Sequence, residues 1–489
     1  MWCAIYLCIL IVVGYPLAAG LARGSTGKAS PPAGKASPPA GKASPPAGKA
    51  SPPERLEIAA LSACMGPGIV GILLIFLSML GERPGREEIL AIGAAWGAAG
   101  IAMWRLRPAA RKALPPRARL SEPRTDTPKW WTIACFVAIG YGLLAVGIDA
   151  LNFPVIEWDA FAIWQLKAEV LAVLPMHPRP GYFSDVALSY SHLRYPVLEP
   201  MVSAGMHAMT GRLDDLGKTI SLLWYAGMLG AVYCAVRRIN GRTAALTATA
   251  VLACLEPFCR YGGTGTAETA LTAFYACGIL CILRWQETGG WGYAILAAIF
   301  SAWMAWTKNE GLALAAVNVV VMAAMGPRGK WGKSLAAAGM LAAVVAILYL
   351  PWIAYTWGLP RTDEDYGARL NPHEIVSNLG RLGTILKGMG TELINWQDWG
   401  LMWVIVLGLA AAERRRFKDR AVATIGILLI LHLLAYVPPL MVTNWNLGEL
   451  LWVTADRLIM HVAPVGAILI GALWPTWVGG TRSKLSVEC

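Results

Sequence analysis

The sequence has little charge and little phenylalanine for its length. Charged residues make up 15% of its 489 positions and Phe occurs 9 times, whereas 56% of the residues are apolar and Trp occurs 22 times. Soluble domains carry about a quarter charged residues, so this composition excludes an ordinary soluble protein. Abundant Trp is typical of the aromatic belts at membrane interfaces. The sequence therefore predicts an integral membrane protein.

The sequence also lacks clustered cysteines. Its 10 Cys are scattered through apolar segments without a CxxC or a zinc-ligand spacing. Such residues are expected to be buried as small hydrophobic side chains, without a disulfide framework. Examples are Cys64, Cys135, Cys234, Cys254, Cys277 and Cys281.

The N-terminal apolar segment, 1–22, has no basic residue in front of it, and Arg23 and Lys28 follow it instead. A secretory signal normally carries its positive charge in front. We therefore expect a retained membrane anchor with a cytoplasmic C-terminal end, with cleavage near Ala19 as the alternative. The heptapeptide KASPPAG recurs within 23–57, and its prolines favour a disordered, polyproline-like linker.

Apolar stretches of roughly 17–25 residues can cross a bilayer as helices. By that criterion the sequence contains about 13 spans, with 11–13 as the range, so we expect an all-α, polytopic transmembrane bundle. The spans lie near 2–22, 58–80, 88–106, 130–150, 216–236, 243–260, 266–284, 291–306, 309–326, 334–357, 399–412, 421–440 and 456–474.

Basic residues are concentrated in alternate loops between these spans, notably in the runs 237–238 and 414–416. Such loops stay cytoplasmic, so the net charge of +12 reflects orientation and not nucleic-acid binding. The tail 476–489 then also lies inside. Two long loops, 151–215 and 358–398, lie on the outer side. Candidate chemistry is therefore expected at the outer face.

The first outer loop carries acidic residues directly after a membrane helix. Glu157 and Asp159 are flanked by aromatic side chains, and Trp164 and Lys167 follow on the same predicted helix. A carboxylate that is partly removed from water in this way can act as a general base. The alternative is an interfacial helix with solvated charges.

Later in the same loop lie His192, Arg194 and Tyr195, followed by a proline that restricts Tyr195 to an extended conformation. These side chains could bind a phosphate or orient a substrate hydroxyl group. A loop that only closes on itself is an equally good explanation.

Charged residues also mark the outer ends of later spans. Glu268 lies in the first turn of one span after Arg260, Lys308 and Glu310 flank a tight turn, and Arg457 opens the last span. A lysine and a glutamate so close to hydrocarbon are costly unless they are paired or used. Helix-dipole stabilisation and snorkelling to the interface are the alternatives.

Several of these elements together resemble bacterial multi-spanning glycosyltransferases of the GT-C superfamily, namely the protein O-mannosyltransferases and the lipid A aminoarabinose transferases. The resemblance covers roughly 130–475. The elements that carry it are Trp158-Asp159-Ala160, Ile163-Trp164, Lys167-Ala168, His192, Tyr195-Pro196, Ala267-Glu268 and Thr307-Lys308-Asn309-Glu310-Gly311.

The resemblance implies a helical catalytic core over 130–475, with a polyprenyl-phosphate-linked sugar as donor and an acid in the first outer loop as base. Asp159 matches the first-loop acid of the family, and Glu268 lies where such proteins often carry Asp. We expect three groups of site residues: the carboxylates Asp159, Glu157 and Glu268 in catalysis, the cations Arg457, Lys308, Arg260 and Arg194 at the donor phosphate, and His192, Tyr195, Glu310, Trp164 and Lys167 at the substrate. Residues 58–129 would form two accessory helices and a basic cytoplasmic loop. Because no sizeable soluble domain follows the last span, the outer loops are expected to recognise the acceptor, whether glycan, lipid or protein.

The resulting hypothesis is an inverting glycosyltransferase of the cytoplasmic membrane that works at its periplasmic or extracellular face. No cofactor is required and no metal site is assigned, although a divalent cation is kept open because Asp159, Asp185 and His192 could converge. Nucleic acid is not an expected partner, whereas membrane lipids are. The alternatives are a transporter or flippase of lipid-linked glycans, disfavoured because only Asn318, His432 and His461 are polar near mid-span, and a non-catalytic envelope assembly protein.

Overall fold

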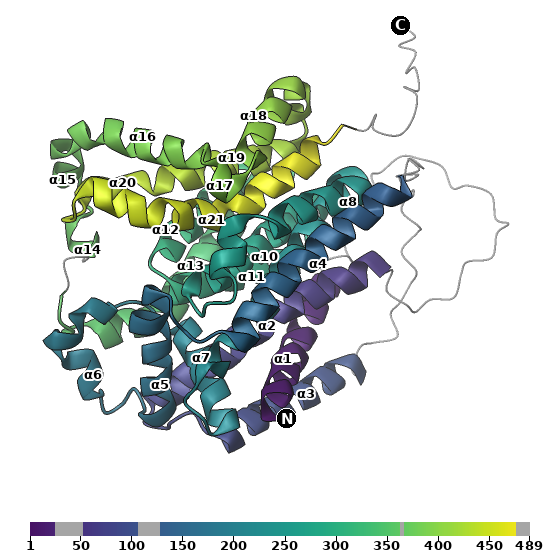
Figure 1. Ribbon diagram of the computed structural model, residues 1–489. Coiled ribbons are helices and arrows are strands. Elements are labelled where there is room, and N and C mark those ends of the chain that lie inside the picture. Colours follow the sequence, from purple (N-terminus) through teal and green to yellow (C-terminus); the bar gives the residue numbers. More distant parts are fainter. Residues whose placement is uncertain (25–51, 106–127, 362–365, 476–489) are drawn as a thin grey trace, which may run out of the picture.

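The computed structural model describes residues 1–24, 52–105, 128–361 and 366–475, and within these ranges the chain forms helices and no strands (Figure 1). The predicted linker repeats, the basic loop around 107–127 and the tail 476–489 lie outside the described residues. The long helices are α1 (Trp2–Gly24), α2 (Pro52–Met79), α3 (Arg86–Arg105), α4 (Lys129–Asn152), α8 (Ser221–Ala253), α10 (Ala267–Thr288), α11 (Trp291–Thr307), α12 (Glu310–Ala324), α13 (Trp331–Thr356), α18 (Met402–Ala412), α19 (Arg420–Ala435) and α21 (Leu447–Leu473).

Among the described residues, eight helical segments are long and apolar enough to cross a membrane, and α11, α12 and α18 are shorter apolar helices. The segment 215–253 contains two of the predicted spans. Its chain reverses at Asn240 and Gly241, where Gly241 has a φ of 82°. The Tyr225 hydroxyl donates to the carbonyl of Ala253 at 3.0 Å, so the two arms of α8 lie antiparallel. The predicted all-α membrane bundle is confirmed.

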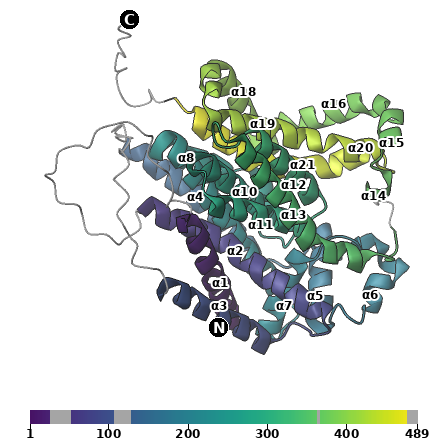
Figure 2. The ribbon, with the colours of Figure 1, turned by 180° about the vertical axis from the view of Figure 1, so that it is seen from behind.

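The N-terminal helices pack into the bundle, and the retention of 1–22 as a membrane anchor stays a prediction. Figure 2 shows α1 between α2 and α3, and α1 contacts both. The crossing of α1 and α2 is close, because a Cβ atom at Gly66 would lie 1.5 Å from the carbonyl oxygen of Leu10. Small residues allow helix backbones to approach in this way in membranes. The hydroxyl of Tyr6 also donates to the Val202 carbonyl at 3.0 Å.

A buried acid ties α2 to the following helices. Glu57 is 2% exposed and accepts hydrogen bonds from Arg238 (2.6 and 2.9 Å), Arg284 (3.2 Å) and the Tyr293 hydroxyl (2.7 Å). A buried carboxylate is tolerated only when it is paired in this manner. Glu57 lies inside the segment predicted as linker, because α2 begins at Pro52; proline is well accommodated in the first turn of a helix.

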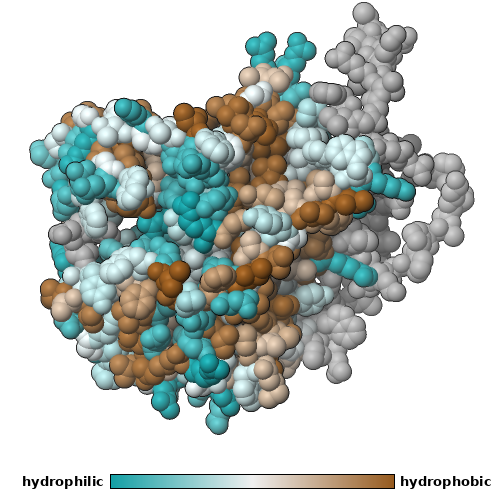
Figure 3. All heavy atoms as spheres, viewed as in Figure 1, coloured by the Kyte–Doolittle hydropathy of each residue, from teal (hydrophilic) through white to brown (hydrophobic). Residues whose placement is uncertain are grey.

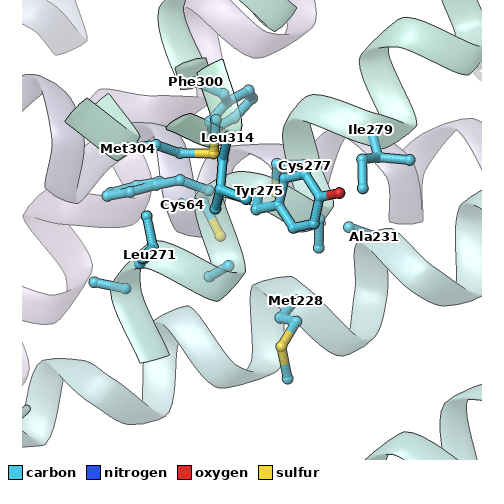
Figure 4. Packing of buried hydrophobic residues seen from close by; sticks show 14 of the residues in the cluster. Cys64, Met228, Ala231, Leu271, Tyr275, Cys277, Ile279, Phe300, Met304 and Leu314 are labelled. Atoms are coloured by element: carbon cyan, nitrogen blue, oxygen red, sulfur yellow. The ribbon is translucent and has the colours of Figure 1, made fainter. Parts of the chain in front are cut away.

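The apolar core lies between α2, α8, α10, α11 and α12 (Figure 4). Cys64 and Cys277 are buried there among Met228, Leu271 and Phe300. The expectation of buried cysteines also holds for Cys135, Cys234 and Cys281, and the nine cysteines of the described residues are free. It was wrong for Cys254, which is exposed at the C-terminal end of α8, and for Cys8, which is exposed on α1, while Cys3 and Cys259 are half-buried.

Polar side chains near mid-span each make a hydrogen bond to a neighbouring helix, although Asn318 Oδ1 and His461 Nε2 are buried without a partner among the described residues. Asn318 donates to the Ser301 hydroxyl at 3.1 Å. His432 is hydrogen-bonded to the Tyr275 hydroxyl, and His461 to that of Tyr436 at 3.2 Å. Interhelical hydrogen bonds of this kind hold membrane helices together.

Both long loops predicted to lie on the outer side contain helices. The first includes η1 (Ala160–Gln165), α5 (Leu166–Val173), α6 (Gly181–Ser184), η2 (Val186–Ser191), α7 (Leu198–Thr210) and η3 (Asp215–Ile220). The second includes α14 (Tyr366–Arg369), α15 (Pro372–Ser377), η4 (Leu379–Arg381), α16 (Leu382–Leu393) and α17 (Trp396–Trp399), and the remaining short elements are α9 (Glu256–Tyr261), η5 (Arg414–Lys418) and α20 (Val437–Val442). Hydrophobic residues cover broad areas of the face in Figure 3, as expected for lipid-exposed helices such as α4.

Candidate active site

Five of the predicted site residues form one continuous chain of ion pairs, which we term the central ion network: Asp159, Arg457, Glu268, Lys308 and Glu310. The Arg457 guanidinium donates to the Asp159 carboxylate and lies 3.7 Å from Glu268. Lys308 Nζ lies 2.9 Å from Glu268 and 3.1 Å from Glu310. The network therefore joins the segment after α4 to α10, the α11–α12 turn and α21.

Asp159 lies at the N-terminus of η1, which is a π-helix. Single π-helical turns occur frequently at functional sites. The neighbouring Glu157 caps this helix, because its side chain accepts the backbone N–H of Ala160 at 2.8 Å. Burial raises the pKa of Glu157, and the nearby carboxylates Asp159 and Glu268 add to the rise. Glu157 thus both caps η1 and adds a second carboxyl group beside Asp159.

Glu268 is fully buried in the first turn of α10, where the helix dipole favours a negative charge. Lys308 is 7% exposed and ends α11 with an extended backbone, which turns its side chain toward Glu268. Glu268 Oε2 and Glu310 Oε2 are buried, and among the described residues neither has a hydrogen-bond partner. Unsatisfied acceptors therefore lie beside the two cations of the network.

Four predicted substrate-binding residues form a second group next to η1. Lys167 is fully buried and its ammonium donates to the His192 carbonyl at 2.7 Å. The same ammonium lies 5.8 Å from the ring centre of Trp164 and 5.7 Å from that of Tyr195, and the His192 ring stacks on Tyr195 at 4.5 Å. Burial lowers the pKa of Lys167 to about 7. This group combines an aromatic surface with a titratable amine.

His192 has a left-handed backbone, with a φ of 51°. Histidine is among the few non-glycine residues that adopt this conformation at moderate cost. The conformation directs its carbonyl oxygen to the Lys167 ammonium and to the backbone N–H of Tyr195, which donates at 2.8 Å. The carbonyl oxygen of His192 thereby holds both the Lys167 side chain and the backbone of Tyr195 in place.

Arg260 belongs to a neighbouring acidic group. It pairs with Glu256 at 2.7 Å, with Asp398 at 3.0 Å and with Asp456 at 3.5 Å. Asp456 directly precedes Arg457 and also accepts from the Tyr261 hydroxyl at 2.8 Å. These pairs dock α17, from the second long loop, beside the central ion network.

The remaining candidates have other surroundings. Arg194 is half-buried, and its positive charge interacts electrostatically with the hydroxyl group of Tyr349 on α13. Asp185 is exposed and caps η2 by accepting the Ala187 N–H at 2.9 Å. In the part of the chain that the structure describes, no three His, Cys, Asp or Glu side chains are grouped as metal ligands. A dependence on a divalent cation stays a prediction.

The sequence did not single out a buried polar bridge behind η1. Gln165 donates to the Glu199 carboxyl at 3.1 Å and to the Gly265 carbonyl at 2.9 Å, and Ser203 donates to Glu199 at 2.9 Å. One signal was available, since Glu199 lies in an otherwise apolar stretch that the structure shows as the buried helix α7.

Comparison with known families supports the sequence-based resemblance. Residues 195–355 match the family described as dolichyl-phosphate-mannose-protein mannosyltransferase. The match includes Glu268, Lys308 and Glu310, whereas Asp159 precedes it and Arg457 follows it. The predicted resemblance to GT-C membrane glycosyltransferases is confirmed, on a third of the chain.

Among solved structures, the chain is similar to an archaeal oligosaccharyltransferase, AglB from Archaeoglobus fulgidus, whose structure contains an inhibitory peptide and a dolichol-phosphate. The two share 11% identity with a TM-score of 0.40, over 71% of this chain and 50% of the other. The chain thus spans half the length of that protein. No curated protein matches the sequence.

Proposed function

We propose that this chain, which resembles GT-C membrane glycosyltransferases, transfers a sugar from a polyprenyl-phosphate donor to an acceptor at the outer face of the cytoplasmic membrane. The central ion network is the observation that carries the proposal. It unites a first-loop acid, Asp159, with the cations Arg457 and Lys308 at the ends of four membrane-associated elements. The match to the mannosyltransferase family over 195–355 supports the donor class.

Arg457 is the proposed ligand of the donor phosphate. Its guanidinium has a planar set of donors that suits phosphate oxygens, and it currently pairs with Asp159. A phosphate group bound by the Arg457 guanidinium would displace the Asp159 carboxylate from this ion pair. Donor binding would in that way expose the base at the moment when the sugar arrives. Lys308 supplies a second positive charge beside Glu268.

In the proposed reaction, Asp159 accepts the proton of the acceptor hydroxyl or amine as that group attacks the anomeric carbon. The bond from the anomeric carbon to the phosphate oxygen breaks, and the polyprenyl phosphate leaves with the bonding electrons, so the anomeric configuration is inverted. A positioned base contributes about 10²–10⁴-fold to the rate. The cations stabilise the charge that develops on the leaving phosphate.

The experiment uses the purified full-length protein in lipid nanodiscs with a polyprenyl-phosphate-linked sugar. Donor cleavage by the wild type that is lost in Arg457→Gln, but retained in the exposed-arginine variant Arg212→Gln, supports the proposal. Counterflow of the lipid-linked sugar in proteoliposomes without any cleavage would instead support a transporter.

The outer location is tested separately, by labelling single cysteines introduced at Asn152 and Arg414 of a variant without native cysteines, in intact cells. Labelling at position 152 and protection at 414 are expected. The reverse pattern would place the site on the cytoplasmic side.

A further inference from the structure

A buried bridge behind η1 connects the two ends of the candidate site. The side-chain amide of Gln165, the last residue of η1, donates to Glu199 on α7 and to the backbone carbonyl of Gly265. Gly265 lies three positions before Glu268, in the turn that leads into α10. Because both acceptors are oxygens, the amide nitrogen must face them. The bridge therefore links the helix after Asp159 to the helix that carries Glu268.

Glu199 is held in one orientation by its other contacts. It is 1% exposed, and its Oε1 accepts from Gln165 and from the Ser203 hydroxyl, which also donates to the Gly217 carbonyl at 3.2 Å. Its Oε2 is buried without a hydrogen-bond partner among the described residues. A buried carboxylate with no paired cation is strongly disfavoured, whereas the neutral acid is tolerated. Burial accordingly raises the pKa of Glu199 to about 8.

The turn at Gly265 packs so closely against Gln165 and Lys218 that it has no space for a side chain at position 265. Gly265 has a φ of 88°, and a Cβ atom there would lie 2.8 Å from Gln165 Nε2 and 2.8 Å from Lys218 Cβ. The Gln165 amide thus packs directly on the glycine backbone. Any displacement of Gln165 would be transmitted to this turn and to the first turn of α10.

We propose that Glu199, in its neutral carboxylic acid form, is a positioning residue. It orients the Gln165 amide and thereby fixes the positions of Asp159 and Glu268 relative to one another. The inference rests on the proposed function for its kinetic effect, but its structural effect is independent of the reaction. A displacement of about 1 Å in a reacting group can cost on the order of 10²-fold in rate. A loss of the bridge should therefore reduce kcat more than it changes the KM of the donor.

Two substitutions separate the roles of shape, charge and hydrogen bonding. Glu199→Gln preserves an uncharged acceptor oxygen for Gln165 and Ser203, whereas Glu199→Leu removes it at similar volume. Glu169→Leu, at an exposed acid on the adjacent α5, is the matched control. Hydrogen–deuterium exchange of 160–166 and 262–268 is measured with the kinetics, and Gln165→Met removes the bridge from its other side if Glu199→Leu does not fold.

We expect Glu199→Gln to retain kcat within about threefold, and Glu199→Leu to lose about tenfold or more with little change in donor KM. Amide exchange in both segments should accelerate in Glu199→Leu and stay unchanged in Glu199→Gln and Glu169→Leu. Unchanged exchange and kcat in folded Glu199→Leu would overturn the positioning role, and a Glu199→Gln variant as impaired as Glu199→Leu would overturn the neutral acid. If the wild type transfers no sugar, the proposed function is wrong. The exchange data would still show whether the bridge through Gln165 and Glu199 stabilises the two segments.

Discussion

The guanidinium of Arg457 lies against the carboxylate of Asp159, a residue 298 positions earlier in the chain. The pair connects the last long helix to the segment directly after α4. The Asp159 side chain is 24% exposed and that of Arg457 is 12% exposed, so the pair lies between solvent and the buried Glu268. An anionic ligand that reaches Arg457 competes directly with Asp159.

Arg457→Lys tests whether the planar guanidinium matters beyond its charge. Lysine keeps the positive charge but loses the pair of parallel donors, so we expect the donor KM to rise about tenfold or more. Steady-state kinetics against donor concentration measure this effect. Arg212→Lys, at an exposed arginine outside the central ion network, should leave the KM unchanged. Equal KM values for Arg457→Lys and the wild type would remove Arg457 from phosphate recognition.

Lys308→Met should destabilise the protein, because it leaves the fully buried Glu268 without its closest cation. Breaking a buried ion pair from one side costs about 3–5 kcal/mol. The double variant Lys308→Met/Glu268→Gln removes the stranded charge and should recover part of this loss. Thermal unfolding of the wild type, Lys308→Met, Glu268→Gln and the double variant in one detergent measures the coupling. Additive effects would show that the two side chains do not stabilise one another.

The buried Lys167 should make the free energy of unfolding depend on pH. Burial lowers its pKa to about 7 in the folded protein from an ordinary value of 10.5, so between these values the unfolded chain binds the proton more strongly. The stability of the wild type relative to Lys167→Met should therefore rise as the pH increases from 7 toward 10, and should be constant below about 7. Thermal unfolding of both proteins across this range provides the test. A difference that is independent of pH would contradict the lowered pKa.

Gly265→Ala should destabilise the turn before α10. The left-handed backbone disfavours any side chain there, and the new methyl group would collide with Gln165 and Lys218. A cost of about 1–3 kcal/mol is expected for such strain. Gly181→Ala is the control, because a Cβ atom at Gly181 meets nothing within 4 Å. Unfolding curves that are shifted equally by both variants would refute the special role of Gly265.

Much of the site was predictable because hydropathy and loop charge place residues at one level of the membrane. Glu268, Lys308, Glu310 and Arg457 were recognised at span ends in this way, and Asp159 by its position after a span. Their pairing was not predictable, because it depends on which helix ends become neighbours in the packed bundle. Hydropathy alone also did not reveal that α1 packs against α2 and α3 in the bundle.

The helix after Asp159 was predicted, but the other helices of the two long loops were missed for a related reason. The buried helix α7 is 13 residues long, too short to be recognised as a span. Glu199 therefore looked like a loop residue, although it is almost completely buried. Its contact with Gln165 depends on tertiary packing, which no local pattern encodes.

The most direct measurement is sugar transfer by purified Asp159→Asn in nanodiscs, compared with the wild type and with Asp185→Asn. Asparagine keeps the size of the side chain but cannot accept the acceptor's proton, so kcat should fall about 10²–10⁴-fold while the protein stays folded. Asp185 is exposed in the same long loop, and its variant should retain activity. Unchanged turnover in folded Asp159→Asn would contradict the assignment of Asp159 as the base.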